Sequence, residues 1–221
     1  VAERVAGKPW DVLLKEKILE PAGLKNAATL EQDLLFQRIA VGHTSNLQGS
    51  TPRVIRPWHF TRSQGPAGST LAMSAHDLAR FGGIFLNSGV TETGQRILSN
   101  HAIQTMVTPQ VELPMHFYAK SWCIGPSMDK WSGVKVWGHG GSNISGKSYL
   151  HWLPDKSGVI AFILNTPAAM DRFAKVMFEE VAKITFGVTK PLIKAPSPPL
   201  TIADPQRYVG TYESLDLSCV I

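Results

Sequence analysis

Three apolar segments in the second half of the chain alternate with turn residues and precede a helical pattern. Val134–Trp137, Lys147–Leu153 and Val159–Asn165 carry the β-branched and aromatic residues that are typical of strands. Residues 154–158, Pro-Asp-Lys-Ser-Gly, are turn formers, which predicts an antiparallel hairpin of the last two strands. Apolar side chains then recur at helical spacing at Phe173, Val176, Met177, Val181 and Ile184. This spacing predicts an amphipathic helix that lies on the sheet and ends at Gly187, with its apolar stripe in the core.

Before these strands, the chain is predicted to be helical with one long irregular stretch. Val1–Ala6 has the pattern of a short helix ended by Gly7, and Pro9 suits the first turn of the next helix. Residues 30–70 hold many Gly and Pro residues without a sustained period, which is typical of a loop packed over a site. The run from Ser74 to Asp77 has the layout of a capping box, so a helix is expected to follow it. Asp77 is otherwise interpreted as a capping or surface residue.

The composition argues against several classes of protein. Of 221 residues, 43% are apolar and 18% are charged, as in a globular chain. No apolar run approaches the roughly 18 residues of a membrane-spanning helix, and the net charge of +5 is spread without a basic block, so neither a membrane span nor a nucleic-acid partner is expected. Cys123 and Cys219 form no disulfide framework or metal-type pair, and Cys123 is interpreted as a buried apolar residue. No motif such as H-E-x-x-H occurs, so neither a metal nor a cofactor is expected.

His139-Gly-Gly141 is the first candidate for chemistry. It follows the predicted strand Val134–Gly138 and precedes the next strand. Paired glycines allow a ligand or another backbone to approach closely, and their N–H groups can face a developing oxyanion. The alternative is a tight turn with an incidental histidine. Gly146 adds flexibility nearby, and Lys147 adds a cation.

Ser127-Met-Asp-Lys130 matches S-x-x-K, in which a lysine lies one helical turn from a serine nucleophile. The chemistry needs this spacing because residues i and i+3 share a helix face. Gly125 and Pro126 precede the match, however, and no apolar helical pattern surrounds it. It is therefore interpreted as a chance match.

Taken in order, several segments resemble a known family. They are GKPWDVLLKEKILEPAGL (7–24), AVGH (40–43), PAGSTLAMSAHDLARFGGIFLNSG (66–89), ILS (97–99) and WGHGGSNISGKSYLHWLPDKSGVIAFILNT (137–166). Over about residues 1–187 the chain resembles the beta-lactamase-related serine hydrolases. That group includes class C beta-lactamases, D-alanyl-D-alanine carboxypeptidases, D-aminopeptidases and family VIII carboxylesterases. The Pro66–Asp77 segment and the H-G-G with its hairpin are the most specific parts.

The resemblance implies an α+β fold of the beta-lactamase/transpeptidase type, with an antiparallel sheet flanked by helices and an adjoining helical region. It implies hydrolysis of a small-molecule ester, amide or lactam through an acyl-enzyme, with no cofactor. His139, Gly140 and Gly141 correspond to the K-T-G or H-x-G motif on the strand that lines the site. Ser142, which follows the motif, corresponds to a donor of a backbone oxyanion-hole N–H. The resemblance is also compatible with a periplasmic or secreted location, which the sequence leaves open.

The chain departs from the family pattern in its nucleophile and base. In the family, S-x-x-K and Y-x-N lie upstream of the G-K-P-W segment, and no Y-x-N occurs in this sequence. The resemblance therefore predicts the C-terminal portion of a hydrolase domain over residues 1–187, incomplete at its N-terminus and inactive alone, with the missing N-terminal segment as a candidate partner. Residues 188–205 read as a proline-rich linker, and residues 206–221 resemble the start of a second, β-barrel-like domain that is cut off.

Two further expectations concern specificity and activity. A lysine at the first motif position is a permanent cation, whereas His139 is only partly charged near neutral pH. This difference weakens the case for substrates that carry a carboxylate and favours esters. The alternative to a serine hydrolase is a non-catalytic binding or structural remnant of the same fold.

Overall fold

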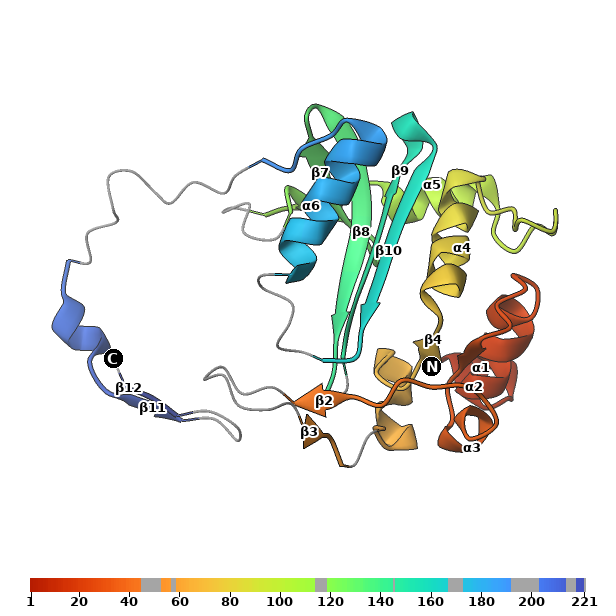
Figure 1. Cartoon of the computed structure of the whole chain (residues 1–221), viewed down its shortest axis with the longest axis horizontal. Coiled ribbons are helices and arrows are strands. Elements are labelled where there is room, and N and C mark those ends of the chain that lie inside the picture. The colour runs from red at the N-terminus through yellow and green to blue at the C-terminus, as the bar shows by residue number, and fades with distance from the viewer. Residues whose placement is uncertain are drawn as a thin grey trace. The chain divides into compact units, whose positions relative to one another are not determined.

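The chain divides into two units, Val1–Pro191 and Leu192–Ile221. A computed structural model describes residues 1–44, 53–56, 59–113, 119–144, 146–166, 173–191, 203–213 and 218–220 (Figure 1). The larger unit combines helices with an antiparallel sheet, which confirms the predicted α+β class.

Six antiparallel strands form the sheet of the larger unit, in the order β10-β9-β8-β7-β6-β5. Their bounds are β5 Val111–Glu112, β6 Ser121–Trp122, β7 Ser127–Trp131, β8 Val134–Ser142, β9 Lys147–Leu153 and β10 Gly158–Leu164. The predicted hairpin of β9 and β10 is confirmed, with Gly158 paired to Leu153 and Ser157 in the left-handed conformation at the turn. The strand predicted to end at Gly138 runs on through Ser142, so the H-G-G lies inside β8.

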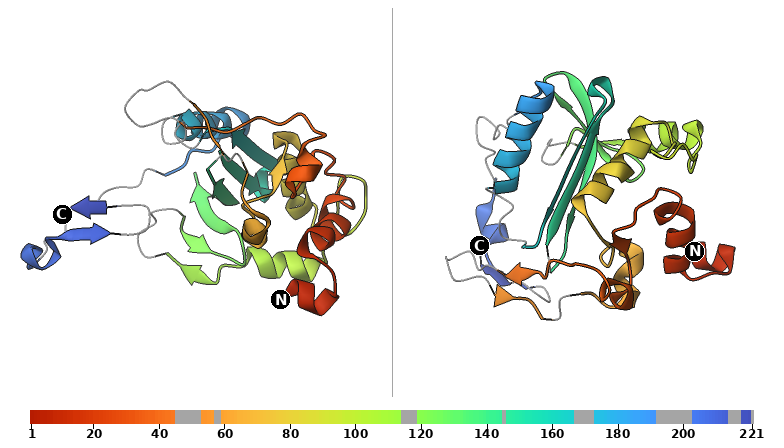
Figure 2. Two further views of the ribbon diagram at one scale, coloured as in Figure 1. Left: turned by 90° about the horizontal axis from the view of Figure 1, so that it is seen from below. Right: turned by 45° about the vertical axis from the view of Figure 1, so that its right-hand side comes forward.

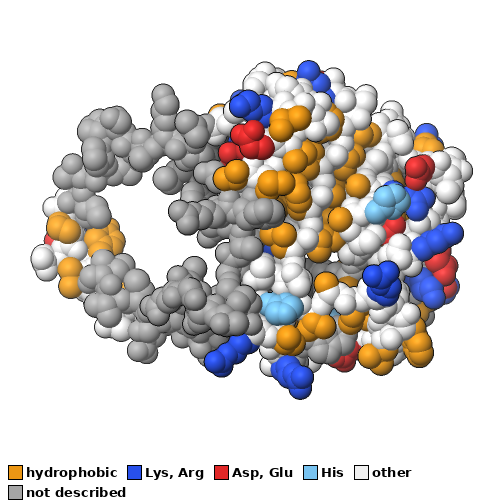
Figure 3. All heavy atoms as spheres, in the orientation of Figure 1, with side chains coloured by type: hydrophobic (Ala, Val, Ile, Leu, Met, Phe, Trp, Pro, Cys, Tyr) orange, Lys and Arg blue, Asp and Glu red, His pale blue; other side chains and the backbone are white. Residues whose placement is uncertain are grey.

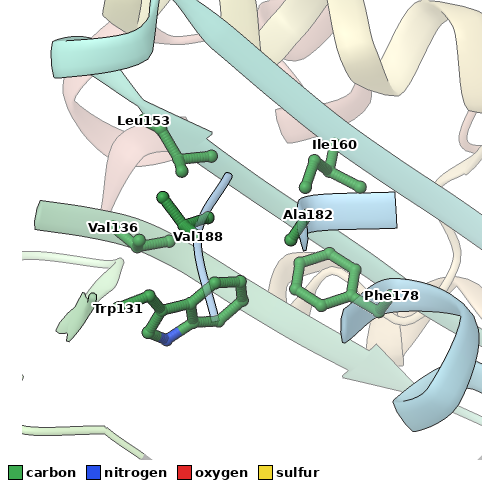
Figure 4. Close-up of a cluster of buried hydrophobic side chains, with 7 residues drawn as sticks. All are labelled: Trp131, Val136, Leu153, Ile160, Phe178, Ala182 and Val188. Atoms are coloured by element: carbon green, nitrogen blue, oxygen red, sulfur yellow. The ribbon is translucent and has the colours of Figure 1, made fainter. Parts of the chain in front are cut away.

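Helices cover both faces of this sheet, α6 (Phe173–Phe186) on one face and α4 (Ala75–Leu86) with α5 (Asn100–Val107) on the other (Figure 2). The cluster between α6 and the sheet consists of buried apolar side chains (Figure 4): Trp131, Val136, Leu153, Ile160, Phe178, Ala182 and Val188. The helix lies on the sheet as predicted, but the expectation for its apolar stripe is wrong. The helix packs through Phe178 and Ala182, and of the predicted stripe only Val181 is seen to pack against this cluster, whereas Val176, Met177 and Ile184 are exposed because they lie on the outer side of the helix. Gly187, in the left-handed conformation with φ 67°, follows the last turn of α6 as predicted.

The opposite face packs against α4 and α5 through a second cluster, which contains Phe85, Ile103, Leu150 and Trp152. The Phe85 and Trp152 rings stack with their centroids 4.5 Å apart. Gly82 permits the close approach of α4, because a Cβ there would lie 2.8 Å from side-chain atoms of Leu150 and Val159. Trp152 and its neighbour Leu153 thus serve opposite faces, as the two-residue period of a strand requires.

The start of α4 confirms the capping box and corrects one expectation. The Ser74 Oγ accepts a hydrogen bond from the Asp77 N–H at 3.0 Å. Asp77 is not a surface residue, because only 1% of it is exposed and its Oδ2 accepts from the Asn26 N–H at 2.6 Å. Arg80 donates from Nη1 to the Gly23 carbonyl at 2.7 Å. These two contacts attach α4 to the N-terminal segment.

The N-terminal part consists of short elements. They are α1 Ala2–Ala6, α2 Trp10–Leu14, a π-helical turn η1 Lys15–Leu19, β1 Ala27–Ala28, α3 Glu31–Leu34, β2 His43–Thr44, β3 Arg53–Val54, a 3-10 turn η2 Arg62–Ala67 and β4 Ala72–Met73. Gly7 ends α1 in the left-handed conformation, as predicted. The described parts of the stretch 30–70 hold only such short elements, and residues 45–52 lie outside the described residues. Pairing of β1 with β4 fixes the end of this stretch next to α4.

Apolar side chains also gather on the outer surface over α6 and the strands beside it (Figure 3). The exposed apolar residues of α6 are Val176, Met177 and Ile184, and β10 contributes Ile163. Among the helices that the structure describes, none is long and apolar enough to span a membrane.

The smaller unit contains a 3-10 turn η5 (Pro205–Tyr208) and a hairpin of β11 (Thr211–Glu213) and β12 (Ser218–Val220). The Tyr212 hydroxyl donates to the Tyr208 carbonyl at 2.9 Å and closes the turn. The first described strand of residues 206–221 begins at Thr211. Most of the predicted linker, residues 192–202, lies outside the described residues, as does the side chain of Cys219.

Candidate active site

Strand β8 has two parts that differ in their neighbours. Val134–Gly138, termed the paired half, faces β7 on one side, and its last two residues also face β9 on the other. His139–Ser142, termed the open half, pairs with β9 through the register His139–Leu150 to Ser142–Lys147. On its other side, β7 ends at the pairing of Ser127 with Gly138. Within the described ranges, no strand continues along that side of the open half.

Two contacts fix the direction of the backbone groups in the open half. The Asn143 N–H donates to the Gly146 carbonyl at 3.0 Å, so odd-numbered residues direct their N–H and C=O groups toward β9. The Gly138 carbonyl accepts from the Ser127 hydroxyl at 3.0 Å, so even-numbered residues face the side of β7. Ser142 is even-numbered, and its N–H therefore points to the side where the described residues place no strand. A backbone N–H in such a position can donate to an oxyanion.

The side chain of His139 is exposed beside this edge. Its imidazole makes an edge-to-face contact with the Trp122 ring, with centroids 5.6 Å apart and planes at 76°. Gly140 is half-buried and Gly141 is exposed. The structure thus brings all four predicted site residues onto one short strand segment, and the tight-turn alternative for the H-G-G is wrong because the turn follows later, at residues 143–146.

That turn joins the two segments of the sequence that carried the family resemblance most specifically. The Asn143 Oδ1 accepts from the Gly146 N–H at 2.9 Å, and its Nδ2 donates to the Ser69 carbonyl at 3.2 Å. Gly146 has no room for a side chain, because a Cβ would lie 2.1 Å from the Leu164 carbonyl oxygen. The loop at Ser69 is held in turn by His59, whose Nε2 lies 3.1 Å from the Thr70 carbonyl oxygen. Sequence reasoning missed Asn143, because its partner Ser69 lies 74 residues away in the sequence.

The S-x-x-K match at Ser127 does not form a nucleophile–lysine pair. Ser127 and Lys130 lie on β7, where residues three apart point to opposite faces. Ser127 is buried, with its hydroxyl bonded to Gly138, and Lys130 is exposed. A second match, Ser132 and Lys135, spans the turn between β7 and β8, where the Ser132 Oγ accepts from the Thr189 N–H at 2.9 Å. Both serines have structural roles.

A third formal match to a sequence motif lies in the turn between β8 and β9. Residues 141–148, Gly-Ser-Asn-Ile-Ser-Gly-Lys-Ser, fit the phosphate-binding pattern G-x-x-x-x-G-K-[S/T]. That chemistry requires a glycine-rich loop that opens a helix, so that several backbone N–H groups point at one phosphate. The structure instead places Gly141 at the end of β8 and Lys147 at the start of β9, with a hairpin turn between them. The match is therefore not a phosphate loop.

Two other titratable side chains lie in the core. Burial lowers the pKa of His151 to about 3, and the charges of Lys190 and His139 act in the same direction. The His151 ring packs against Phe178 with centroids 4.7 Å apart, and its buried Nδ1 has no hydrogen-bond partner among the described atoms. Burial likewise raises the pKa of the Cys123 thiol, which donates to the Val107 carbonyl at 3.3 Å. His151 is half-buried with its Nδ1 covered, and Cys123 is buried as predicted.

Metal ligands are not clustered in the described ranges, where no three His, Cys, Asp or Glu side chains lie close enough to hold an ion. Two surface grooves lie around α3, away from β8. One of about 160 Å³ runs from Thr29 to Gln32 and from His59 to Arg62. The other, of about 660 Å³, lies between α2 and α3. The candidate site on β8 therefore lies apart from both grooves.

The chain is similar in sequence and in fold to several known proteins. A family model described as Beta-lactamase matches residues 1–181. Penicillin-binding protein 4 of Amycolatopsis lactamdurans is 32% identical over 217 residues, which is 96% of this chain and 56% of the relative. The octameric penicillin-binding protein homologue from Pyrococcus abyssi aligns with a TM-score of 0.68 at 22% identity, over 82% of this chain and 39% of that one. A D-stereospecific amidohydrolase from Streptomyces sp. aligns with a TM-score of 0.63 at 21% identity, over 83% of this chain and 50% of that one. The chain therefore spans about half the length of the relatives that it matches.

Proposed function

The chain belongs to the beta-lactamase family, and we propose that it supplies the substrate-facing strand of a serine hydrolase that works through an acyl-enzyme. Membership of the family supports hydrolase chemistry in general. The observation that carries the more specific proposal is the open half of β8, where the H-G-G is followed by a backbone N–H that faces the side on which none of the described strands pairs.

The proposed reaction has two steps. A serine hydroxyl attacks the substrate carbonyl, its proton passes to a Lys/Tyr pair, and the alcohol or amine leaves with a proton as the acyl-enzyme forms. Water then attacks the acyl-enzyme and releases the acid. In each step the carbonyl oxygen becomes an oxyanion, to which the Ser142 N–H donates. Removing one such donor costs roughly 3–4 kcal/mol of transition-state stabilisation in other hydrolases.

The serine and the Lys/Tyr pair do not come from the motifs in these 221 residues. Ser127 and Ser132 are structural, and no Y-x-N occurs in the sequence. We therefore propose that the chain alone is inactive and that the nucleophile belongs to a segment outside it. The proposed division into residues 1–187, 188–205 and 206–221 is supported by the two structural units, which separate near Pro191.

The proposed substrates are small esters, amides or lactams. Amides are supported by the D-stereospecific amidohydrolase that shares the fold. Esters are favoured over substrates that carry a carboxylate, because His139 stands where a permanent lysine cation would bind that group. The Trp122 edge beside His139 adds an apolar wall suited to an uncharged substrate. In an active polypeptide, His139→Lys is expected to gain activity on carboxylate-bearing substrates, and no gain would contradict this preference.

A second candidate is a non-catalytic binding or structural module of the same fold. The observation that favours it is the absence from this sequence of Y-x-N and of a helical S-x-x-K. The two candidates differ in what the complete reading frame encodes. An in-frame S-x-x-K and Y-x-N supports the hydrolase, and a start codon at the first residue supports the module.

The proposed function is tested by treating two samples with a fluorophosphonate probe and with p-nitrophenyl acetate. One sample is the 221-residue chain, and the other is the product of the complete reading frame. We expect labelling and ester hydrolysis only in the second sample, both abolished when its motif serine is changed to alanine. Absence of labelling in both samples would contradict the hydrolase, and labelling of the 221-residue chain would show that the nucleophile had been misplaced.

A further inference from the structure

A single side chain joins the end of the open half to a loop on the helical side of the molecule. The backbone N–H of Asn143 and both polar atoms of its side chain make hydrogen bonds. Its N–H donates to the Gly146 carbonyl, its Oδ1 accepts from the Gly146 N–H, and its Nδ2 donates to the Ser69 carbonyl. The Ser69 carbonyl lies 74 residues away in the sequence, so this contact is tertiary and not part of the turn itself.

The loop that receives this contact is itself firmly placed. The Gly68 N–H donates to the Gly65 carbonyl at 2.8 Å, and Thr70 is buried with 2% of its surface exposed. Directly after Leu71, β4 pairs with β1, and the Ser74 N–H donates to the Asn26 carbonyl at 3.0 Å. The Ser69 carbonyl is therefore a fixed acceptor and can hold Asn143 in place.

We propose that Asn143 is a positioning residue that fixes the direction of the Ser142 N–H. The reason is adjacency, because the peptide plane that carries the Asn143 N–H directly follows Ser142 and is held by the bond of that N–H to the Gly146 carbonyl. The Asn143 side chain strengthens this anchor by accepting from the Gly146 N–H, and it ties the same residue to the helical side through the Ser69 carbonyl. Among the described strands, this strand end pairs with β9 alone, so a further anchor limits its twisting, and a donor that must meet an oxyanion tolerates little displacement. The inference rests on the proposed function only in giving Ser142 a role in the reaction.

Two substitutions distinguish the contact of the Asn143 side chain with Gly146 from its contact with Ser69. Asn143→Ala removes both side-chain contacts, whereas Asn143→Asp keeps the acceptor for the Gly146 N–H and loses the donor to Ser69. Asn165→Ala is a matched control. Asn165 lies just beyond the end of β10, and its Nδ2 donates to the Val41 carbonyl at 3.1 Å, so it makes a similar contact between a strand end and a loop without adjoining Ser142.

The first readout is nuclear magnetic resonance of the 221-residue chain. We expect the Gly146 amide to exchange roughly fivefold faster in Asn143→Ala and to keep most of its protection in Asn143→Asp. The Ser142 amide is expected to change its chemical shift and gain fast motion in both variants, but not in Asn165→Ala. A Ser142 amide that behaves as in the unmodified chain in both Asn143 variants would overturn the proposal.

The second readout is turnover by the product of the complete reading frame. Both Asn143 variants are expected to lower kcat on p-nitrophenyl acetate roughly tenfold with KM changed less than about twofold, because the donor acts in the transition state. Asn165→Ala is expected to keep both values. An unchanged kcat in both variants would overturn the catalytic part of the inference. If the unmodified product is not labelled by a fluorophosphonate, the proposed function fails, and the resonance measurement still decides whether Asn143 holds Ser142.

Discussion

The two halves of β8 are built from one continuous strand and yet meet different surroundings. The paired half has a strand beside it along β7 and is covered by the α6 cluster, in which Val136 is 1% exposed. The open half has β9 on one side and ends in exposed residues, Gly141 and Ser142. The difference shows how one strand can be anchored at one end and present backbone donors at the other. The end of β7 at Ser127 creates the boundary.

The largest difference between the halves is expected in stability. On the side of the paired half, Trp131 of β7 lies opposite Val134, is 1% exposed and contributes its ring to the α6 cluster. Trp131→Ala is expected to lower the free energy of unfolding by about 3–5 kcal/mol, because the cavity cannot collapse between a sheet and a helix. His139→Ala, in the open half, is expected to change it by less than about 0.5 kcal/mol. Urea unfolding, followed by tryptophan fluorescence and far-UV circular dichroism, measures the free energy of unfolding of both variants. Equal losses of stability in the two variants would contradict the expected difference between the halves.

A glycine in each half gives a second contrast. A Cβ at Gly138 would lie 2.4 Å from the His151 ring and 2.5 Å from the Leu150 carbonyl oxygen, and this backbone atom cannot move aside. Gly138→Ala is therefore expected to cost about 3 kcal/mol. A Cβ at Gly141 would meet only the Ser148 hydroxyl at 2.6 Å, which can rotate away, so Gly141→Ala is expected to cost less than about 1 kcal/mol. Urea midpoints that fall equally for the two variants would contradict this reading of the strand.

The core beside the paired half also has a pH signature. Because burial lowers the pKa of His151 to about 3, the native chain binds fewer protons than the unfolded chain below the ordinary histidine pKa of about 6.5. Stability is expected to fall as the pH is lowered from about 6.5 toward 3, by about 2 kcal/mol at pH 5 from this group alone. His151→Phe should flatten the decline, whereas His101→Gln, an exposed histidine of α5, should leave it unchanged. A decline as steep in His151→Phe would assign the effect to other groups.

The sequence predicted the elements with a long regular period and missed those without one. The hairpin of β9 and β10 and the helix α6 were found because each repeats its pattern over seven or more residues. Strands β5 and β6 have two residues each, and the polar and apolar residues of β7 do not alternate regularly, so no period marks them. Without β7, the division of β8 into two halves could not be foreseen.

The residues of the candidate site were predicted from the sequence, but the tertiary contacts that hold them in place were not. His139, Gly140, Gly141 and Ser142 form the open half, where the family resemblance placed a motif. The supports depend on contacts between distant parts of the chain, which no local pattern encodes. Asn143 reaches Ser69 across 74 residues, and Asp77 is buried because Asn26, 51 residues earlier, donates to it. In the same way, three formal motif matches proved structural because their setting was a strand or a hairpin.

Amide hydrogen exchange along β8, resolved by residue in the 221-residue chain, tests the central claim most directly. We expect the amides of Val136 and Trp137 to exchange slowly, because the Val136 N–H faces β7 and the Trp137 N–H faces β9. In the open half the rates are expected to alternate, with a protected Gly141 amide that faces β9 and a rapidly exchanging Ser142 amide that faces the edge. A Ser142 amide as protected as that of Val136 would show that its N–H is already bonded, and it would contradict the assignment of this edge to an oxyanion.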